Sequence, residues 1–199
     1  MQIKNRQTKG GNIIMKTAIG YKLFEMNAEG KLFPLFIGKT KEVELNKWIH
    51  AEYIPTKGFA PRGGWHIGEI PDAPWLKGYD GSDVGVYKSQ RGKTFKRVWC
   101  KVEYNINHDY NEEVAKMKKK CFVDKCPEDG FYFFAECGKG VWSITSDIRI
   151  IKILTEEERQ EILKEMKHDE VEAYRPYKEA FEKRNHNKLI NDIRMMKGA

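Results

Sequence analysis

The stretch that begins at Arg62 gathers a guanidinium, an imidazole and two carboxylates within eleven residues of a glycine-rich segment. If this stretch is extended, His66 shares a face with Gly68 and opposes Trp65 and Glu69, so the glycine leaves space beside the imidazole. An imidazole with such space can act as a general base or bind a phosphate. The pattern predicts that Arg62 holds a phosphate, that His66 and Glu69 exchange protons, and that Trp65 stacks on a base.

A third carboxylate, Glu103, can complete an acid/base set with His66 across the fold. It lies in a run that alternates apolar and polar residues over 97–104, which is typical of a central strand. The structural alternatives stay open for both residues. His66 can instead donate to a backbone carbonyl while Trp65 fills the core, and Glu103 can form a cross-strand ion pair with Lys101 or another lysine.

Residues 55–92 contain eight glycines, four prolines and several aromatic rings, which include Trp75. A connection of this length inside a compact domain is unusual unless it is functional or disordered, and the aromatic residues argue against disorder. We therefore expect an ordered loop that lines a site, with Trp75 among the residues that contact a ligand.

A basic run without acidic residues spans the end of this loop and the following strand. Lysines and arginines can neutralise phosphates, while interleaved rings stack on exposed bases. The run favours an acidic partner, which can be DNA, RNA, a dinucleotide or an acidic protein surface. Its candidate binding residues are Lys88, Arg91, Lys93, Lys96, Arg97 and Trp99, and Lys101 continues the run.

The four cysteines have irregular spacing. Cys121, Cys126 and Cys137, with His108 upstream, could supply zinc ligands, but only one pair has the spacing of a structural zinc motif, so we predict no cofactor. Cys100 alternates with valines and is predicted to be a small core residue. The sequence contains no nucleotide-binding glycine motif, metalloprotease motif or nucleophile elbow.

The composition predicts one folded core. The chain has 199 residues, of which 40% are hydrophobic, and a formal net charge of +7. Residues 155–199 hold ten Lys/Arg and eleven Asp/Glu, so the positive excess belongs to residues 1–154. No apolar run is long enough for a membrane span or a signal peptide, and the cysteine usage suits a reducing compartment. We expect a cytoplasmic protein that does not enter the membrane.

The local patterns predict an α+β fold with a mostly antiparallel, twisted sheet of about five to six strands and one or two short helices. A core domain over 19–154 is expected between a disordered basic arm at 1–18 and a helical extension at 155–199, which could bind a partner or form a homo-oligomer. The expected elements are a hairpin over 20–26 and 32–37, an amphipathic helix over 43–53, a strand over 97–104, a short helix capped by Asp109 or Asn111, strands over 130–136 and 141–154, and helices that begin at Thr155 and Pro176.

The order of several segments resembles an uncharacterised domain found in phage and mobile-element proteins, including very large multidomain ones. The resemblance covers about residues 18–155. It implies a viral or mobile-element product that works in a bacterial cytoplasm, in host takeover or counter-defence, and it assigns no catalytic role. The segments that carry it are Gly20–Phe24, Gly30–Leu35, Arg62–Pro71, Val98–Tyr104, Trp142–Ile144 and Ile148–Leu154.

Two functions are consistent with these observations. In the first, the protein binds nucleic acid or an acidic host partner through its basic face. In the second, it is a small enzyme that acts on nucleic acid or a nucleotide, nuclease-like or ADP-ribosyltransferase-like, with a site at Arg62, His66 and Glu69. Binding requires fewer residues to be correctly placed, and we take it as the main hypothesis.

Overall fold

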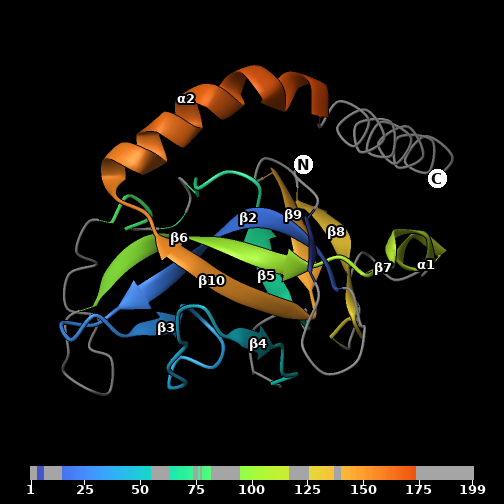
Figure 1. The fold of residues 1–199 in the computed structure, drawn as a ribbon, viewed down its shortest axis with the longest axis horizontal. Coiled ribbons are helices and arrows are strands. Elements are labelled where there is room, and N and C mark those ends of the chain that lie inside the picture. Colours follow the sequence, from blue (N-terminus) through green and yellow to red (C-terminus); the bar gives the residue numbers. More distant parts are fainter. Residues whose placement is uncertain are drawn as a thin grey trace, which may run out of the picture. The chain divides into compact units, whose positions relative to one another are not determined.

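The computed structural model describes residues 4–6, 15–54, 63–73, 76, 78–81, 95–116, 126–136 and 140–173. Within this part of the chain, ten strands form one sheet and two helices accompany them (Figure 1). The helices are α1 (Asn111–Lys116) and α2 (Glu156–Ala173). The strands are β1 (Lys4–Arg6), β2 (Met15–Met26), β3 (Leu32–Pro34), β4 (Trp48–His50), β5 (Trp65–Gly68), β6 (Lys96–Asn105), β7 (His108–Asp109), β8 (Gly130–Glu136), β9 (Gly140–Thr145) and β10 (Asp147–Ile153).

The fold is broadly α+β, as the sequence predicted, but it is mostly β, and the sheet is larger than the expected five to six strands. Its order is β4-β10-β6-β2-β5-β9-β8-β7, with β1 and β3 also paired to β2. Nearly all of these pairs are antiparallel, and β7 with β8 is parallel. β6 lies between β10 and β2, so the prediction of a central strand there is confirmed (Figure 1).

The additional strands β1, β4 and β7 have only two or three residues each, which is too short for an alternating pattern to be recognised. In addition, the single strand predicted over 141–154 is divided at Ser146 into β9 and β10. Lys4–Arg6 pairs with Met15–Thr17, so part of the arm predicted to be disordered forms a ladder. β2 and β3 form the predicted hairpin. β3 is short and ends at Pro34, because proline has no N–H to donate to the ladder.

The amphipathic helix predicted over 43–53 is wrong. Val43 bridges Leu32 and Leu45 bridges Ile150, and the next residues form β4 against β10. The apolar residues of this segment therefore cover the edge of the sheet in extended form. Tertiary pairing overrides the helical spacing because these residues can satisfy their backbone groups on the neighbouring strands.

The sheet curls around its core. β4 and β5 are separated by three strands in the sheet order, which corresponds to roughly 19 Å in a flat sheet. Nevertheless, the Trp65 indole Nε1 on β5 donates to the Ile49 carbonyl on β4 at 3.0 Å. The Ser143 hydroxyl on β9 similarly reaches the Tyr104 hydroxyl on β6 at 3.2 Å. Such contacts require a strongly twisted, barrel-like sheet.

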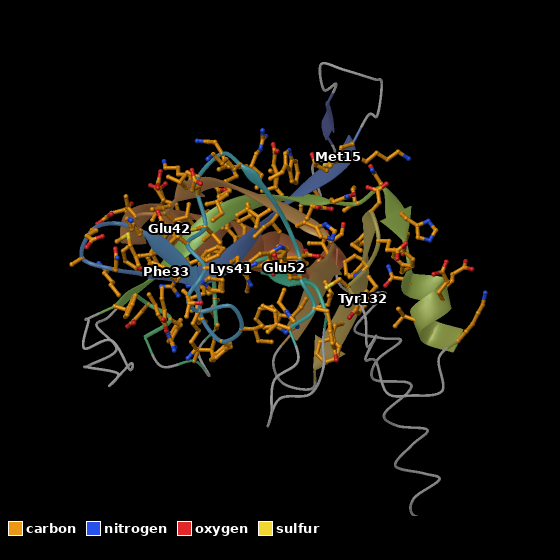
Figure 2. The ribbon with its side chains drawn as sticks, turned by 90° about the horizontal axis from the view of Figure 1, so that it is seen from below. Met15, Phe33, Lys41, Glu42, Glu52 and Tyr132 are labelled. Atoms are coloured by element: carbon orange, nitrogen blue, oxygen red, sulfur yellow. The ribbon has the colours of Figure 1, made fainter. Side chains whose placement is uncertain are left out.

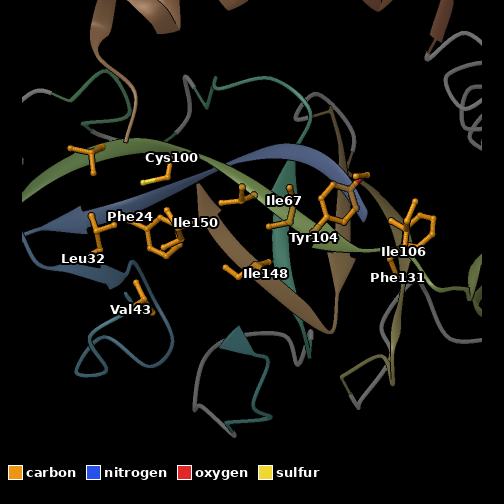
Figure 3. Packing of buried hydrophobic residues seen from close by; sticks show 13 residues of the cluster. Phe24, Leu32, Val43, Ile67, Cys100, Tyr104, Ile106, Phe131, Ile148 and Ile150 are labelled. Carbon is orange, nitrogen blue, oxygen red and sulfur yellow. The ribbon is translucent and has the colours of Figure 1, made fainter. Parts of the chain in front are cut away.

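The main core fills the inside of this curl (Figure 3). Val98, Cys100, Val102 and Tyr104 all belong to it, so the predicted apolar face of β6 is confirmed. Its other members include Phe24, Leu32, Val43, Ile67, Ile106, Phe131, Ile148 and Ile150.

Gly20 allows β5 to approach β2 at the centre of this core. A Cβ at this position would lie 2.4 Å from the Ile67 side chain, 3.0 Å from the Gly68 carbonyl and 3.3 Å from the Tyr104 ring. Only a residue without a side chain fits there.

β10 contains an irregularity that changes which residues face inward. The register between β10 and β6 shifts between Ile150 and Lys152, so that Lys152 pairs with Lys101 and Ile153 with Cys100. Ile153 therefore packs against the core, whereas an unbroken alternation would point it outward. The bulge places Lys152 on the outer side, where it is exposed.

α2 begins at the predicted capping box. The Glu158 backbone N–H donates to the Thr155 hydroxyl at 3.3 Å, and the Thr155 N–H donates to the Glu158 carboxylate at 3.1 Å. The helix starts within the first of two compact units, Met1–Gln160, and the second comprises Glu161–Ala199. The helix predicted from Pro176 lies outside the described residues. No described helix is long and apolar enough to cross a membrane.

Candidate functional site

Trp65 and His66 lie in β5, where the sequence placed an extended segment. Trp65 packs against the core, and its indole N–H donates a hydrogen bond to the Ile49 carbonyl. The Lys22 ammonium lies 5.4 Å from the centre of its ring. The Trp65 ring is therefore engaged in contacts within the protein. His66 is half-buried and pairs with Ile144, and its backbone carbonyl accepts a hydrogen bond from Lys22 Nζ at 3.1 Å.

The space beside Gly68 is filled by the protein. A Cβ at Gly68 would lie 3.1 Å from the Ile70 carbonyl and 3.5 Å from the Trp142 ring. The glycine thus allows Ile70 and Trp142 to pack closely, and among the described residues these two fill the position that a side chain at 68 would occupy. Burial chiefly raises the pKa of the Tyr104 hydroxyl, and the negative charge of the Glu69 carboxylate raises it further. Glu69 therefore lies within electrostatic range of this core residue.

The structure does not bring Glu103 to His66. Glu103 pairs with Ile19 in β2, whereas Gly68 of β5 pairs with Tyr21. Continuing this antiparallel register, His66 lies four residues farther along β2 than Glu103, which corresponds to roughly 13 Å along the strand. The Glu103 carboxylate instead forms an ion pair with Arg149 of β10.

Three residues of the predicted basic run meet in one depression of about 300 Å³. Lys96, Arg97 and Trp99 of β6 form one wall of it. Lys96 is exposed, whereas Arg97 and Trp99 are each only 4% exposed. The Trp99 indole donates to the Tyr79 carbonyl at 2.6 Å, so this ring is a fixed part of the wall. Arg62, Trp75, Lys88, Arg91 and Lys93 lie outside the described residues.

The first turn of α2 forms the opposite wall and is fixed by Arg159. This buried guanidinium donates to the Pro71 carbonyl at 2.8 Å and pairs with Asp72 and Glu156 at 3.3 and 2.8 Å. It also lies over the Tyr79 ring, 5.2 Å from its centre. Because all these groups belong to the protein, Arg159 holds the wall in place and is not a binding group.

Carboxylates give the depression a second, acidic side. Glu156 and Glu157 line the depression from α2, and Asp80 lines it from the turn at residues 78–81. The Glu157 carboxylate accepts from its own backbone N–H and from the Thr155 hydroxyl, which lowers its pKa. A ligand that fits both sides needs a negative group toward Lys96 and hydrogen-bond donors toward α2.

Several lysines in the described part of the fold are neutralised by carboxylates. Lys96 and Lys101 of β6 are among those that form no ion pair within the described residues, together with Lys16, Lys22 and Lys164. Lys101 lies opposite Lys152, a repulsive arrangement that Glu158 offsets by pairing with Lys152. The neutralised pairs include Lys31–Glu42, Lys41–Glu52 and Lys47–Glu44, of which Lys41 and Glu52 are labelled in Figure 2.

The positive excess of the body lies in segments outside the described residues. Residues 55–62, 77, 82–94, 117–125 and 139 hold eleven Lys/Arg and only two Asp/Glu. The segment 82–94, which holds Lys88, Arg91 and Lys93 against one acidic residue, comes directly before β6 in the sequence. Three of the eleven basic residues therefore precede the strand that carries Lys96 and Lys101.

A polar network that the sequence reasoning missed lies at the other end of β6. His50 of β4 pairs with Asp147 of β10, with 2.9 Å between His50 Nδ1 and the carboxylate. Asn105, which is fully buried, donates to Asp147 at 3.1 Å and to Asp129 at 2.8 Å. The four residues are far apart in sequence and have no motif spacing, so only the tertiary pairing reveals them.

The zinc ligands considered from the sequence are not assembled in the described residues. Cys126 is half-buried, and burial raises the pKa of its thiol. His108 pairs with Glu113 at 3.1 Å. Cys121 and Cys137 lie outside the described part. Among the residues the structure describes, no group of three or more His, Cys, Asp or Glu side chains could hold a metal ion.

Comparisons of the chain with protein-family models, with curated proteins and with solved structures found no match.

Proposed function

We propose that the protein binds nucleic acid at the depression formed by Lys96, Arg97 and Trp99 at the start of β6. The observation that carries the proposal is that these three residues, selected from the sequence for contacts with phosphates and bases, line one depression of about 300 Å³. One phosphate lies beside Lys96, and the attached sugar and base face the carboxylates of α2, which accept hydrogen bonds from amino groups.

The distribution of charge supports a polyanion as the ligand. Lys96 and Lys101 form no ion pair with described residues, and the segment 82–94 before them adds Lys88, Arg91 and Lys93 against a single acid. When lysines without an ion pair contact phosphates, counterions are released from the nucleic acid, which gives affinity without base specificity. Paired lysines elsewhere on the fold do not contribute in this way.

The setting we propose is the cytoplasm of a bacterial host, in which the protein acts as an accessory product of a phage or mobile element. The sequence resemblance described above supports this setting. Binding to a host nucleic acid would then serve host takeover or counter-defence.

The proposal is tested by fluorescence anisotropy with a labelled single-stranded oligonucleotide over a range of salt concentrations. For the wild type, the logarithm of the affinity should fall linearly with the logarithm of salt concentration. Substituting both Lys96 and Lys101 with alanine should weaken binding and reduce this slope by about one for each phosphate that is no longer neutralised.

The matched control substitutes Lys41 and Lys47 with alanine. It removes the same charge, but from lysines that form ion pairs, Lys41 with Glu52 and Lys47 with Glu44. This variant should keep the wild-type slope. Equal losses in the two double variants, or no salt-dependent binding by the wild type, would contradict the proposal.

A second candidate function, cleavage of the bound strand, is favoured by the pairing of His50 with Asp147. The catalytic site expected at Arg62, His66 and Glu69 receives less support, because the Gly68 side of His66 is filled and Glu103 lies far along the sheet.

A further inference from the structure

His50 has the geometry of a general base. A carboxylate can only accept hydrogen bonds, so the contact of 2.9 Å with Asp147 places the imidazole hydrogen on Nδ1. The lone pair of the neutral ring is then on Nε2. The His50 side chain is 65% exposed, whereas that of Asp147 is 18% exposed. The basic nitrogen is therefore accessible while the carboxylate that orients the ring is mostly covered.

Asn105 holds this carboxylate in place. Its amide nitrogen donates to both Asp147 and Asp129, and its side-chain oxygen accepts from the Asn107 backbone N–H at 2.8 Å. Rotating the amide by half a turn would direct its oxygen at two carboxylates and break all three bonds. The orientation of Asn105 is thus fixed by its contacts, and it fixes Asp147 and through it His50.

The His50–Asp147 pair lies on the outer face of the sheet, to which Trp99 and Lys101 of β6 also belong. On β10, Ile148 and Ile150 point into the core, so Asp147 and Arg149 point to the opposite, outer face. Arg149, two residues farther along β10, pairs with Trp48 of β4, and its guanidinium lies 5.4 Å from the Trp48 ring. A cation and an aromatic ring therefore lie next to the pair of His50 with Asp147.

The distance along β6 suits a bound strand. Trp99 at the depression and Asn105 beside the pair are six residues apart, which is roughly 20 Å along a strand. A stacked single strand with about 3.4 Å per nucleotide covers this length with about six nucleotides. An oligonucleotide of this length is long enough to extend from the depression to His50.

We infer that His50 is the general base of an RNA-cleaving site; this inference rests on the proposed nucleic-acid binding. His50 Nε2 takes the proton of a ribose 2′-hydroxyl, and the 2′-oxygen forms a bond to the adjacent phosphorus. The bond from phosphorus to the 5′-oxygen of the next nucleotide breaks, and that oxygen takes a proton from water. The products are a 2′,3′-cyclic phosphate end and a 5′-hydroxyl end, and the protonated imidazole returns its proton to solvent.

The substrate class follows from this chemistry. The attacking hydroxyl belongs to the RNA itself, so the step consumes no co-reactant beyond the proton that water supplies. DNA lacks the 2′-hydroxyl and can bind to the same face without being cleaved. Asp147 and Asn105 act as positioning residues, because Asp147 contacts His50, Asn105 contacts Asp147, and neither contacts the reacting atoms.

The test uses the full-length protein with a fluorescent single-stranded RNA and a DNA of the same sequence. The wild type should cleave the RNA to products with cyclic phosphate ends and leave the DNA intact. The H50A variant should lose at least about 100-fold in rate, the usual contribution of a general base, and bind the DNA with unchanged affinity. Circular dichroism checks that each variant is folded.

The matched control is H108A. His108 is also exposed and also paired with a carboxylate, Glu113, but this carboxylate is itself 52% exposed. Cleavage by H108A should match the wild type. Substituting Asp147 with asparagine should lower kcat while KM stays the same, as expected for a residue that orients the base. A loss confined to KM would contradict the positioning role.

Two results separate this inference from the proposed function. If the wild type binds RNA and DNA in a salt-dependent manner but cleaves neither, the RNA-cleaving site is refuted and the binding function stands. Equal cleavage by the wild type and H50A also refutes it, because the activity then comes from a contaminant or another residue. If neither nucleic acid binds, the proposed function and this inference both fail.

Discussion

Replacing Lys22 with methionine should change the stability of the protein by an amount that depends on pH. Lys22 lies on the core side of β2, opposite the buried Cys100, and its ammonium lies 5.4 and 5.7 Å from the Trp65 and Phe24 rings. Its one described hydrogen bond goes to the His66 carbonyl. Burial of the charged form lowers the pKa of Lys22 from 10.5 to about 8.

The magnitude follows from this pKa. A difference of about 2.5 units at 1.36 kcal/mol per unit amounts to about 3 kcal/mol, an upper bound because part of the side chain reaches solvent. Below pH 8 the lysine is charged in both states, and the folded state bears the full cost of burying it. Between pH 8 and 10.5 the unfolded state binds a proton that the folded state does not, so the unfolding free energy of the wild type rises with pH. Above pH 10.5 the cost is gone.

The K22M variant should therefore be more stable than the wild type at pH 7, and this advantage should fall by up to about 3 kcal/mol as the pH rises to 10.5. Urea denaturation of both proteins at several pH values measures the difference, in which other titrating groups cancel. The matched control is K47M, which removes a lysine with a 65% exposed side chain. The reasoning is refuted if the K22M advantage does not change with pH, or changes in the same way as for K47M.

Three further predictions concern stability and reactivity. The G20V substitution should lower the unfolding free energy by about 1–3 kcal/mol, measured by urea denaturation, because its side chain would overlap Ile67; an unchanged midpoint would contradict the packing. The T155A substitution should cost about 1 kcal/mol in the same assay through loss of the helix cap, whereas a wild-type value would mean that the cap is not needed. Cys100, whose thiol pKa burial raises to about 12, should resist alkylation at pH 8 until the protein unfolds, as mass spectrometry can show; rapid labelling of the native protein would contradict its burial.

Patterns longer than about five residues predicted the fold well. The alternation in β6 and the capping box before α2 rest on local physics, and both are found in the structure. The segment 43–53 was misread because Leu45, Trp48 and Ile49 are spaced like a helix face, although their partners lie in β10, which is distant in sequence. The bulge in β10 was also invisible, since it is set by pairing with β6 and not by residue type.

The candidate site was predictable only in part. Lys96, Arg97 and Trp99 are neighbours in sequence, so their meeting in one depression could be anticipated from the basic run. The loop sequence around His66 suggested chemistry, but the packing of Trp142 against Gly68 depends on β9, which the sequence does not place beside β5. The His50–Asp147 pair joins residues 97 positions apart, and no local signal could connect them.

The pairing of β2 with β6 has a consequence for how the chain reaches its native state. Its registers run from Thr17 with Asn105 to Met26 with Lys96, so the central ladder joins segments 70 to 88 residues apart. Closing such a loop costs entropy before any contact repays it, and chains with many distant contacts fold slowly. The antiparallel hairpin of β8 and β9 is local and should form early, with the centre of the sheet completed last. Until then β6 exposes both edges, which makes newly synthesised chains prone to aggregation.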